Sequence, residues 1–435
     1  MDCGRLRSDF VKYVSMNVLG MLGLSCYILA DTWFIARGLG ADGLAALNLA
    51  IPVYSFLYGM GLMVGMGGAT KYALLLGAGR REEAESIFTR ALMFGGILAL
   101  VYVLGGLFGA ERLAALLGAE GEVLSMTATY LQVIMLFAPA FLANNTLLCF
   151  VRNDGGPRLA MAAMVGGSMA NIVLDYVFIF PCGMGIFGAV LATGLAPVIS
   201  LSILSRWFFS GRSSFSLRRT GLTLETVRSI SALGASSLIS ELSSGVVMIV
   251  FNLLILELEG SVGVAAYGVV ANLSLVLLAI FTGVGQGIQP LVSRCCGAGE
   301  RERGRQVYRY ALAAAGVFAL VTYGAIFLFA QPIAAAFNGE GNARLQEIAS
   351  TGLRLYFIAL PFAAYNVVSA LYLSARERPR PAFLISMLRG FVLILPLVFL
   401  LAWQLGMTGV WLAFPAAEGG TALLALLIGR REEKR

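Results

Sequence analysis

Long apolar segments alternate with short charged segments over the whole chain. A helix needs about 20 mostly apolar residues to cross a bilayer, and twelve segments meet that requirement. They span residues 11–36, 44–76, 87–109, 124–151, 159–181, 187–209, 227–256, 262–293, 306–330, 345–375, 381–403 and 407–428. The pattern therefore predicts an all-α membrane protein with twelve transmembrane helices.

The composition supports a membrane protein. Of 435 residues, 59% are hydrophobic and only 13% are charged, whereas about 25% are charged in a soluble domain. The net charge of +7 does not indicate nucleic-acid binding, because the charges lie in short clusters between apolar segments and no soluble domain carries a basic face. We expect no nucleic-acid partner, and a monomer within the lipid bilayer.

The basic residues predict the orientation of the chain. Of the 31 Lys and Arg residues, only Arg37, Arg112, Arg344 and Arg354 fall on one side, and Arg389 falls within a segment; the other 26 fall on the opposite side. Basic residues concentrate in cytoplasmic loops. We therefore expect both termini on the cytoplasmic side of a bacterial inner (cytoplasmic) membrane, which agrees with an even number of spans.

The second half of the sequence repeats features of the first at a nearly constant offset of 220 or 221 residues. The matching pairs are 65–67 with 285–287, 77–82 with 297–302, and 185–192 with 406–413. The repeat predicts two pseudo-symmetric six-helix lobes, residues 1–209 and 227–435, joined by a basic cytoplasmic linker at 210–226. Parallel repeats of this kind build transporters whose pathway runs between the halves.

The side-chain inventory limits the possible chemistry. The sequence has no histidine, which excludes His-ligated zinc sites, Ser-His triads and His proton relays. Its six cysteines form no CxxC pair and behave as small apolar residues. No catalytic residue and no cofactor is therefore expected, and any cation or proton chemistry depends on carboxylates.

One polar pair stands out inside an apolar segment. Asn171 and Asp175 are four residues apart, so they share one face of a helix. An acid within a membrane helix is costly, and it is by default a functional-site hypothesis. The alternative is structural: the acid bonds to a neighbouring helix, and Asn171 holds helices together.

Four pieces of sequence together resemble the multidrug and toxic compound extrusion (MATE) family. They are Ala-Asp-Thr-Trp-Phe-Ile-Ala-Arg-Gly-Leu-Gly at 30–40, Asn-xxx-Asp-Tyr-Val-Phe-Ile-Phe at 171–180, Gly-Met-Gly-Ile-Phe-Gly-Ala-Val-Leu-Ala-Thr at 183–193, and Gly-Gln-Gly-Ile-Gln-Pro at 285–290. The last piece is most similar to the MepA-like bacterial branch. The resemblance implies two six-helix lobes around a V-shaped cleft, and export of bulky, lipophilic or cationic compounds in exchange for Na⁺ or H⁺.

The resemblance also implies roles for individual residues. Asp31, Asn171, Asp175 and Thr193 would form a cation site, possible for Na⁺, and Glu241 resembles the acidic position of the seventh helix. By helix rise, Asp31, Asp175 and Thr193 all lie about 9–10 Å from the outer ends of their helices. Hard oxygen ligands suit Na⁺, but two close carboxylates can also share a proton. The choice between Na⁺ and H⁺ stays open. Thr193 can instead bond its own helix.

Four further residues are candidates for the substrate cleft. Arg389 and Glu418 lie within the last two segments, where a buried ion pair is expected because unpaired charges in lipid are costly. Gln286 and Gln289 are three residues apart, so they either line the cleft or bond carbonyls freed by Pro290. Glu241 lies near mid-membrane, where it either binds cationic cargo or pairs structurally.

Other functions remain as alternatives. A flippase for lipids or lipid-linked oligosaccharides would need a basic cleft lining, whereas Arg389 is the only Arg at mid-span. An intramembrane enzyme is disfavoured because the sequence lacks His, a nucleophile elbow and HExxH. The first segment also lacks the proline at which some MATE relatives bend, and Gly20 and Gly23 are the candidate points of flexibility.

Overall fold

The computed structural model describes residues 3–338 and 341–433, and every regular element in these ranges is helical. Thirteen α-helices follow one another along the chain: α1 Cys3–Gly77, α2 Arg81–Leu116, α3 Gly121–Leu136, α4 Ala138–Asn153, α5 Pro157–Ile179, α6 Gly185–Phe209, α7 Leu224–Gly297, α8 Arg301–Phe337, α9 Ala343–Tyr356, α10 Leu360–Ala375, α11 Pro379–Met387, α12 Ile394–Leu405 and α13 Met407–Glu433. The all-α prediction is confirmed.

Two of these helices each cross the membrane twice. α1 has 75 residues and α7 has 74, so either would be about 110 Å long if straight, against about 30 Å of bilayer hydrocarbon. Each is broken at a glycine, Gly40 (φ 67°) in α1 and Gly260 (φ 64°) in α7, in a conformation that side chains with a Cβ rarely adopt. The two breaks are 220 residues apart, the offset of the sequence repeat.

Three other spans are interrupted where the sequence places a helix breaker. α3 and α4 meet at a 49° bend beside Pro139, a 3₁₀ turn separates α9 from α10 before Pro361, and a π-helical turn, Leu388–Val392, separates α11 from α12. With each interrupted pair as one span, the described residues hold ten candidate spans. Counting α1 and α7 twice gives the twelve predicted from the sequence.

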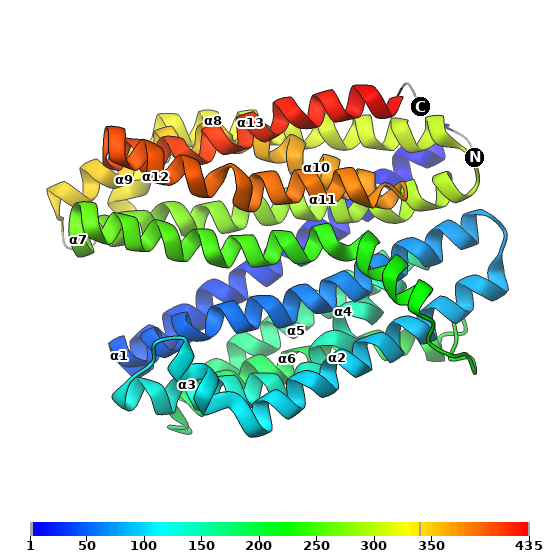
Figure 1. The fold of residues 1–435 in the computed structure, drawn as a ribbon, viewed down its shortest axis with the longest axis horizontal. Coiled ribbons are helices and arrows are strands. Elements are labelled where there is room, and N and C mark those ends of the chain that lie inside the picture. The colour runs from blue at the N-terminus through cyan, green and yellow to red at the C-terminus, as the bar shows by residue number, and fades with distance from the viewer. Residues whose placement is uncertain (1–2, 339–340, 434–435) are drawn as a thin grey trace.

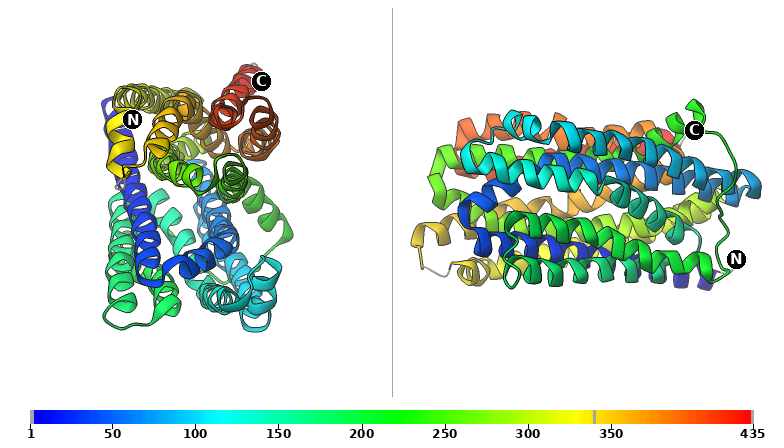
Figure 2. Two further views of the ribbon diagram at one scale, coloured as in Figure 1. Left: turned by 90° about the vertical axis from the view of Figure 1, so that its left-hand side faces the viewer. Right: turned by 90° about the horizontal axis from the view of Figure 1, so that it is seen from below.

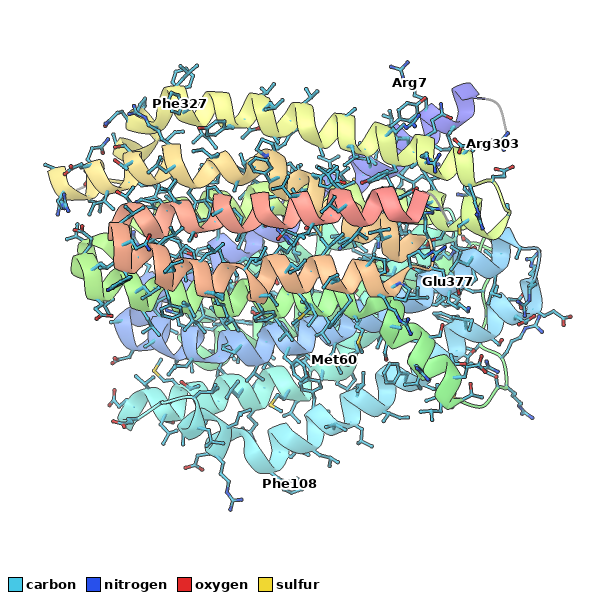
Figure 3. All side chains as sticks on the ribbon, turned by 45° about the horizontal axis from the view of Figure 1, so that its top comes forward. Arg7, Met60, Phe108, Arg303, Phe327 and Glu377 are labelled. Atoms are coloured by element: carbon cyan, nitrogen blue, oxygen red, sulfur yellow. The ribbon has the colours of Figure 1, made fainter. Side chains whose placement is uncertain are left out.

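The helices form two groups. In Figure 1, α7–α13 lie in the upper half of the view and α2–α6 in the lower half, and the end-on view of Figure 2 shows the same division. The first segment of α1 begins beside the upper group and crosses to the lower one. Both ends of the chain lie at one end of the bundle, which we call the terminal end. Arg7, Arg303 and Glu377 lie toward it, and Phe108 projects from the rim (Figure 3).

The linker between the two groups is anchored to the first. Residues 210–223 form no helix, yet Phe215 is only 1% exposed. Ser214 N donates to Asp154 Oδ2 at 2.8 Å, which fixes the linker to the end of α4. The Phe215 ring packs in a cluster of aromatic rings, namely Tyr72, Phe88, Phe150 and Phe208.

Near the terminal end, α1 and α7 touch through reciprocal glycine contacts. A Cβ on Gly77 would meet the backbone oxygen of Arg294, and a Cβ on Gly297 would meet that of Leu74. Positions 74 and 294 are 220 residues apart, as are 77 and 297, so the contact has approximate two-fold symmetry. Gly67 and Gly287 make a second such pair, against Ile230 and Val14. We call Gly67, Gly77, Gly287 and Gly297 the glycine seam; it brings the two groups into backbone contact.

Candidate functional site

Two carboxyl groups from distant parts of the chain meet inside the first group of helices. Asp31 lies in the first segment of α1 and Asp175 in α5. They are 7% and 0% exposed, and their side chains are in hydrogen-bonding contact. A hydrogen bond between two carboxyl groups requires a shared proton, and a cation can replace that proton.

Asn171 and Thr193 complete the cluster from α5 and α6. With the Asn171 amide oriented to satisfy both of its ends, its nitrogen donates to Asp175 Oδ2 (3.0 Å) and its oxygen accepts from Thr193 N (3.2 Å). Asn171 therefore orients the Asp175 carboxyl group, and its carbonyl oxygen is already engaged. The Thr193 hydroxyl donates to Ala189 O in its own helix (3.2 Å), as the structural alternative predicts.

Tyr130 of α3 also belongs to this cluster. Its ring is 3% exposed and its hydroxyl is hydrogen-bonded to the Thr193 side chain. Sequence reasoning missed it, because a tyrosine in an apolar helix has the same pattern as a packing residue. Its place on the interrupted α3–α4 span is the one signal that could have singled it out.

The cluster offers oxygen atoms suited to a small hard cation or a proton. Within the described ranges, Asp31 Oδ1 and Asp175 Oδ1 are buried without a hydrogen-bond partner, and unpaired buried carboxylate oxygens are costly. A proton or Na⁺ held between the two side chains would remove that cost.

A cavity of about 270 Å³ lies between the two groups of helices. The first segment of α1 contributes Tyr27 to its wall, the second contributes Tyr54 and Tyr58, and α7 contributes Glu241 and Tyr267. Aromatic rings give apolar surface that adapts to flat cargo and attracts cations to its faces. The cavity therefore combines a lipophilic wall with one carboxyl group that has no ion pair in the described part of the chain.

Arg389 and Glu418 line the same cavity as an ion pair. Arg389 donates to Glu418 Oε1 through Nε (3.0 Å) and Nη2 (2.6 Å), while Asn366 Nδ2 donates to Glu418 Oε2 at 2.6 Å. The predicted buried pair is confirmed. Arg389 lies on the π-helical turn, a local irregularity that is frequent at functional sites.

The two glutamines differ. Gln286 lines a smaller cavity next to Glu241 and accepts a hydrogen bond from Arg152 Nη1 at 3.0 Å. Gln289 as a cleft residue is a wrong prediction: its Nε2 donates to Thr70 (2.6 Å) and its Oε1 accepts from Asn153 (3.0 Å). Gln289 is 1% exposed and bonds α7 to α1 and α4, because its face of α7 packs on those helices.

Gly20 and Gly23 pack against α5. A Cβ on Gly20 would lie 2.8 Å from Met164 Sδ, and one on Gly23 3.3 Å from Val165 Cγ2. Both glycines therefore permit close approach of α1 to the helix that carries Asp175.

A twelve-span helical bundle with a membrane-buried cavity between two helix groups, and a carboxyl pair beside it, defines a membrane transporter. The family model MatE matches residues 18–177 and 237–400, and the chain belongs to that family. Members of this family are transporters, not enzymes, so the MATE resemblance drawn from the sequence motifs is confirmed.

Individual relatives cover almost the entire chain. Multidrug export protein MepA of Staphylococcus saprophyticus is 27% identical over 413 residues, 94% of this chain and 90% of that protein. An outward-facing structure of a multidrug resistance MATE family transporter of the MOP superfamily superposes with a TM-score of 0.92 at 25% identity, over 98% and 96% of the two chains. A MOP superfamily transporter from Pyrococcus furiosus, whose reversed pocket polarity suggests a different function, gives 0.90 at 25% identity over the same shares.

Proposed function

We propose that this protein is a secondary active multidrug exporter that moves bulky, lipophilic or cationic compounds out of the cell in exchange for Na⁺ or H⁺. The carrying observation is the buried Asp31–Asp175 pair next to a cavity that contains Glu241. The relative named Multidrug export protein MepA supports the cargo class.

The proposal includes an arrangement in the membrane. Residues 1–209 and 227–435 act as two lobes joined by the 210–226 linker, and the pathway runs between them. Both termini face the cytoplasm of a bacterial cell, since 26 of the 31 basic residues lie on that side. The transporter works as a monomer.

Exchange follows from competition for negative charge. With the terminal end closed, the Asp31–Asp175 pair takes up a cation from outside, and the loss of charge lowers the affinity of the cavity for cationic cargo. After the molecule opens inward, the pair gives up its cation and Glu241 accepts new cargo. Antiport requires that the two ligands favour different states or oppose each other's binding.

The cavity argues for cationic cargo over lipid-linked phosphates. Arg389 is neutralised by Glu418 at 2.6 Å, so the charge left over in the cavity wall is the Glu241 carboxyl group. A flippase for phosphate-bearing lipids would need the opposite sign. Reversed pocket polarity is described for the Pyrococcus furiosus protein.

The test is ethidium uptake into everted vesicles that contain the protein, with the Na⁺ gradient and the proton gradient collapsed separately. In the wild type, collapse of the coupling gradient should abolish uptake. Asp175→Asn should reduce gradient-driven uptake to the rate of vesicles without a gradient. The control is Asp42→Asn, at an exposed acid. Full uptake by Asp175→Asn would remove the carboxyl pair from the mechanism.

A further inference from the structure

Two tyrosine hydroxyls meet between the carboxyl pair and the cavity. Tyr27 lies in the first segment of α1 and Tyr54 in the second, on opposite sides of the break at Gly40. Their hydroxyl oxygens are 2.8 Å apart, and either one can donate the hydrogen bond. Both side chains also line the cavity that contains Glu241.

The positions of both rings are fixed by their neighbours. Tyr54 stacks on Tyr58, with centroids 6.1 Å apart and planes at 18°, and meets Phe141 of α4 edge-on at 5.8 Å. Tyr27 precedes Asp31 by four residues, so both project from one face of the same helix. The hydroxyl pair is therefore held in a defined place one helical turn from the carboxyl pair.

The pair also lies within electrostatic reach of both acidic sites. The Tyr54 hydroxyl interacts with the charges of Glu241 and Asp31, and the Tyr27 hydroxyl with that of Asp31. Tyr58, by comparison, interacts with Glu241 but not with Asp31. The Tyr27–Tyr54 bond is thus the hydrogen bond that lies between the cation site and the cavity acid.

We propose that Tyr27 and Tyr54 are positioning residues that transmit the charge of the Asp31–Asp175 pair to the cargo cavity through the direction of their shared hydrogen bond. This inference rests on the proposed exchange function. When the carboxyl pair is negative, the hydroxyl protons point toward Asp31, so Tyr54 donates to Tyr27. The lone pairs of Tyr54 then face the cavity and favour a cationic compound.

Neutralisation of the carboxyl pair reverses the bond. With a proton or Na⁺ on the pair, Tyr27 donates to Tyr54, and the Tyr54 proton turns toward Glu241 and the cavity. The exposed proton opposes a positive cargo and competes for the Glu241 carboxylate. Cation uptake thereby weakens cargo binding without any movement of the backbone, which is the sign that antiport requires.

The experiment measures coupling between two ligands rather than transport. The dissociation constant of ethidium is measured on purified full-length protein at low and high Na⁺ and at low and high pH. The ratio of the two constants is the coupling factor, which is about 5–150 for typical coupled sites. In Tyr27→Phe and in Tyr54→Phe the factor should fall toward 1, while the ethidium affinity at low cation concentration changes less.

Two controls separate coupling from general damage. Tyr58→Phe removes another cavity hydroxyl, outside the pair, and should retain the wild-type coupling factor. Tyr102→Phe removes a buried hydroxyl with no partner in the described structure and should also retain it. The double variant should lose no more coupling than either single variant, because both remove the same bond.

Each contrary outcome has a distinct meaning. A wild-type coupling factor in both single variants would overturn the role of the hydroxyl pair and leave the exporter proposal intact. A wild-type protein whose ethidium affinity ignores both Na⁺ and pH would overturn the exchange function, and the pair's role with it.

Discussion

At the residue scale, the cost of burying charge explains which polar residues are paired. The Glu418 side chain is 1% exposed and that of Arg389 is 13% exposed, so each depends on the other for charge compensation. On the opposite face of the energy scale, Arg344 and Glu259 form an ion pair with Arg344 53% exposed, where water compensates both charges and the pair contributes little.

Glu418→Gln should destabilise the protein, because it leaves the Arg389 charge buried without a carboxylate. The expected loss is about 3–5 kcal/mol of unfolding free energy, seen as a lower midpoint of thermal unfolding in detergent. Glu259→Gln is the matched control and should cost about 0–1 kcal/mol. The double change Arg389→Met with Glu418→Leu should recover most of the loss; equal midpoints for the two Glu variants would contradict the argument.

The sequence predicted the charged members of the site and missed the neutral ones. Asp31 and Asp175 were found because an acid in an apolar helix needs an explanation. Tyr27, Tyr54 and Tyr130 were not found, since tyrosines occur on apolar faces for packing alone. Gln289 was misassigned because helical spacing shows which residues share a face, but not whether that face meets a cavity or another helix.

At the scale of single elements, glycine sets how closely the helices approach. The seam glycines of α1 and α7 touch backbone of the opposite helix, so no rotamer change can make room for an added methyl group. The sequence repeat indicated that 77–82 and 297–302 correspond. It could not show that these glycines touch each other's helix, because that contact depends on how the two groups are docked.

Gly297→Ala should open the seam at the terminal end. Overpacking costs about 1–3 kcal/mol, which would shift the ratio of closed to open molecules about 5- to 150-fold. Spin labels at Arg80→Cys and Glu300→Cys, exposed positions just beyond the seam, should report a longer mean distance. Gly316→Ala on α8, where a Cβ meets nothing within 4 Å, is the control. An unchanged distance in Gly297→Ala would show that the seam yields without opening.

For the whole molecule, the number of spans and the duplication were predictable from hydropathy and the repeat, whereas the closed end was not. Closure depends on contacts between residues more than a hundred positions apart. Arg152 of α4 is 1% exposed, and its described partners are neutral: Asn17 Oδ1 at 2.8 Å, Gln286 Oε1 at 3.0 Å, Met66 and Cys149. Asn17 in turn donates to Gly283 O of α7 at 2.9 Å. These bonds join the two groups of helices just below the cavity.

A buried guanidinium held only by neutral acceptors makes closure sensitive to each of them. Gln286→Leu removes one acceptor, and a lost hydrogen bond to a charged group costs about 1.5–3 kcal/mol. Water replaces the missing acceptor only when the terminal end opens, so the change favours opening by about tenfold or more. The natural reporter is Cys149, which is 1% exposed with its Sγ 3.6 Å from Arg152 Nη2.

With the other five cysteines replaced by serine, alkylation of Cys149 by N-ethylmaleimide should be slow in the parent protein and about tenfold faster in Gln286→Leu. Gln346→Leu, which removes an exposed amide bonded to Gln331 at the start of α9, should leave the rate unchanged. Ethidium together with a collapsed cation gradient should change the parent rate as well, because cargo and cation select different states. Equal rates in Gln286→Leu and the parent would mean that Arg152 does not hold the terminal end closed.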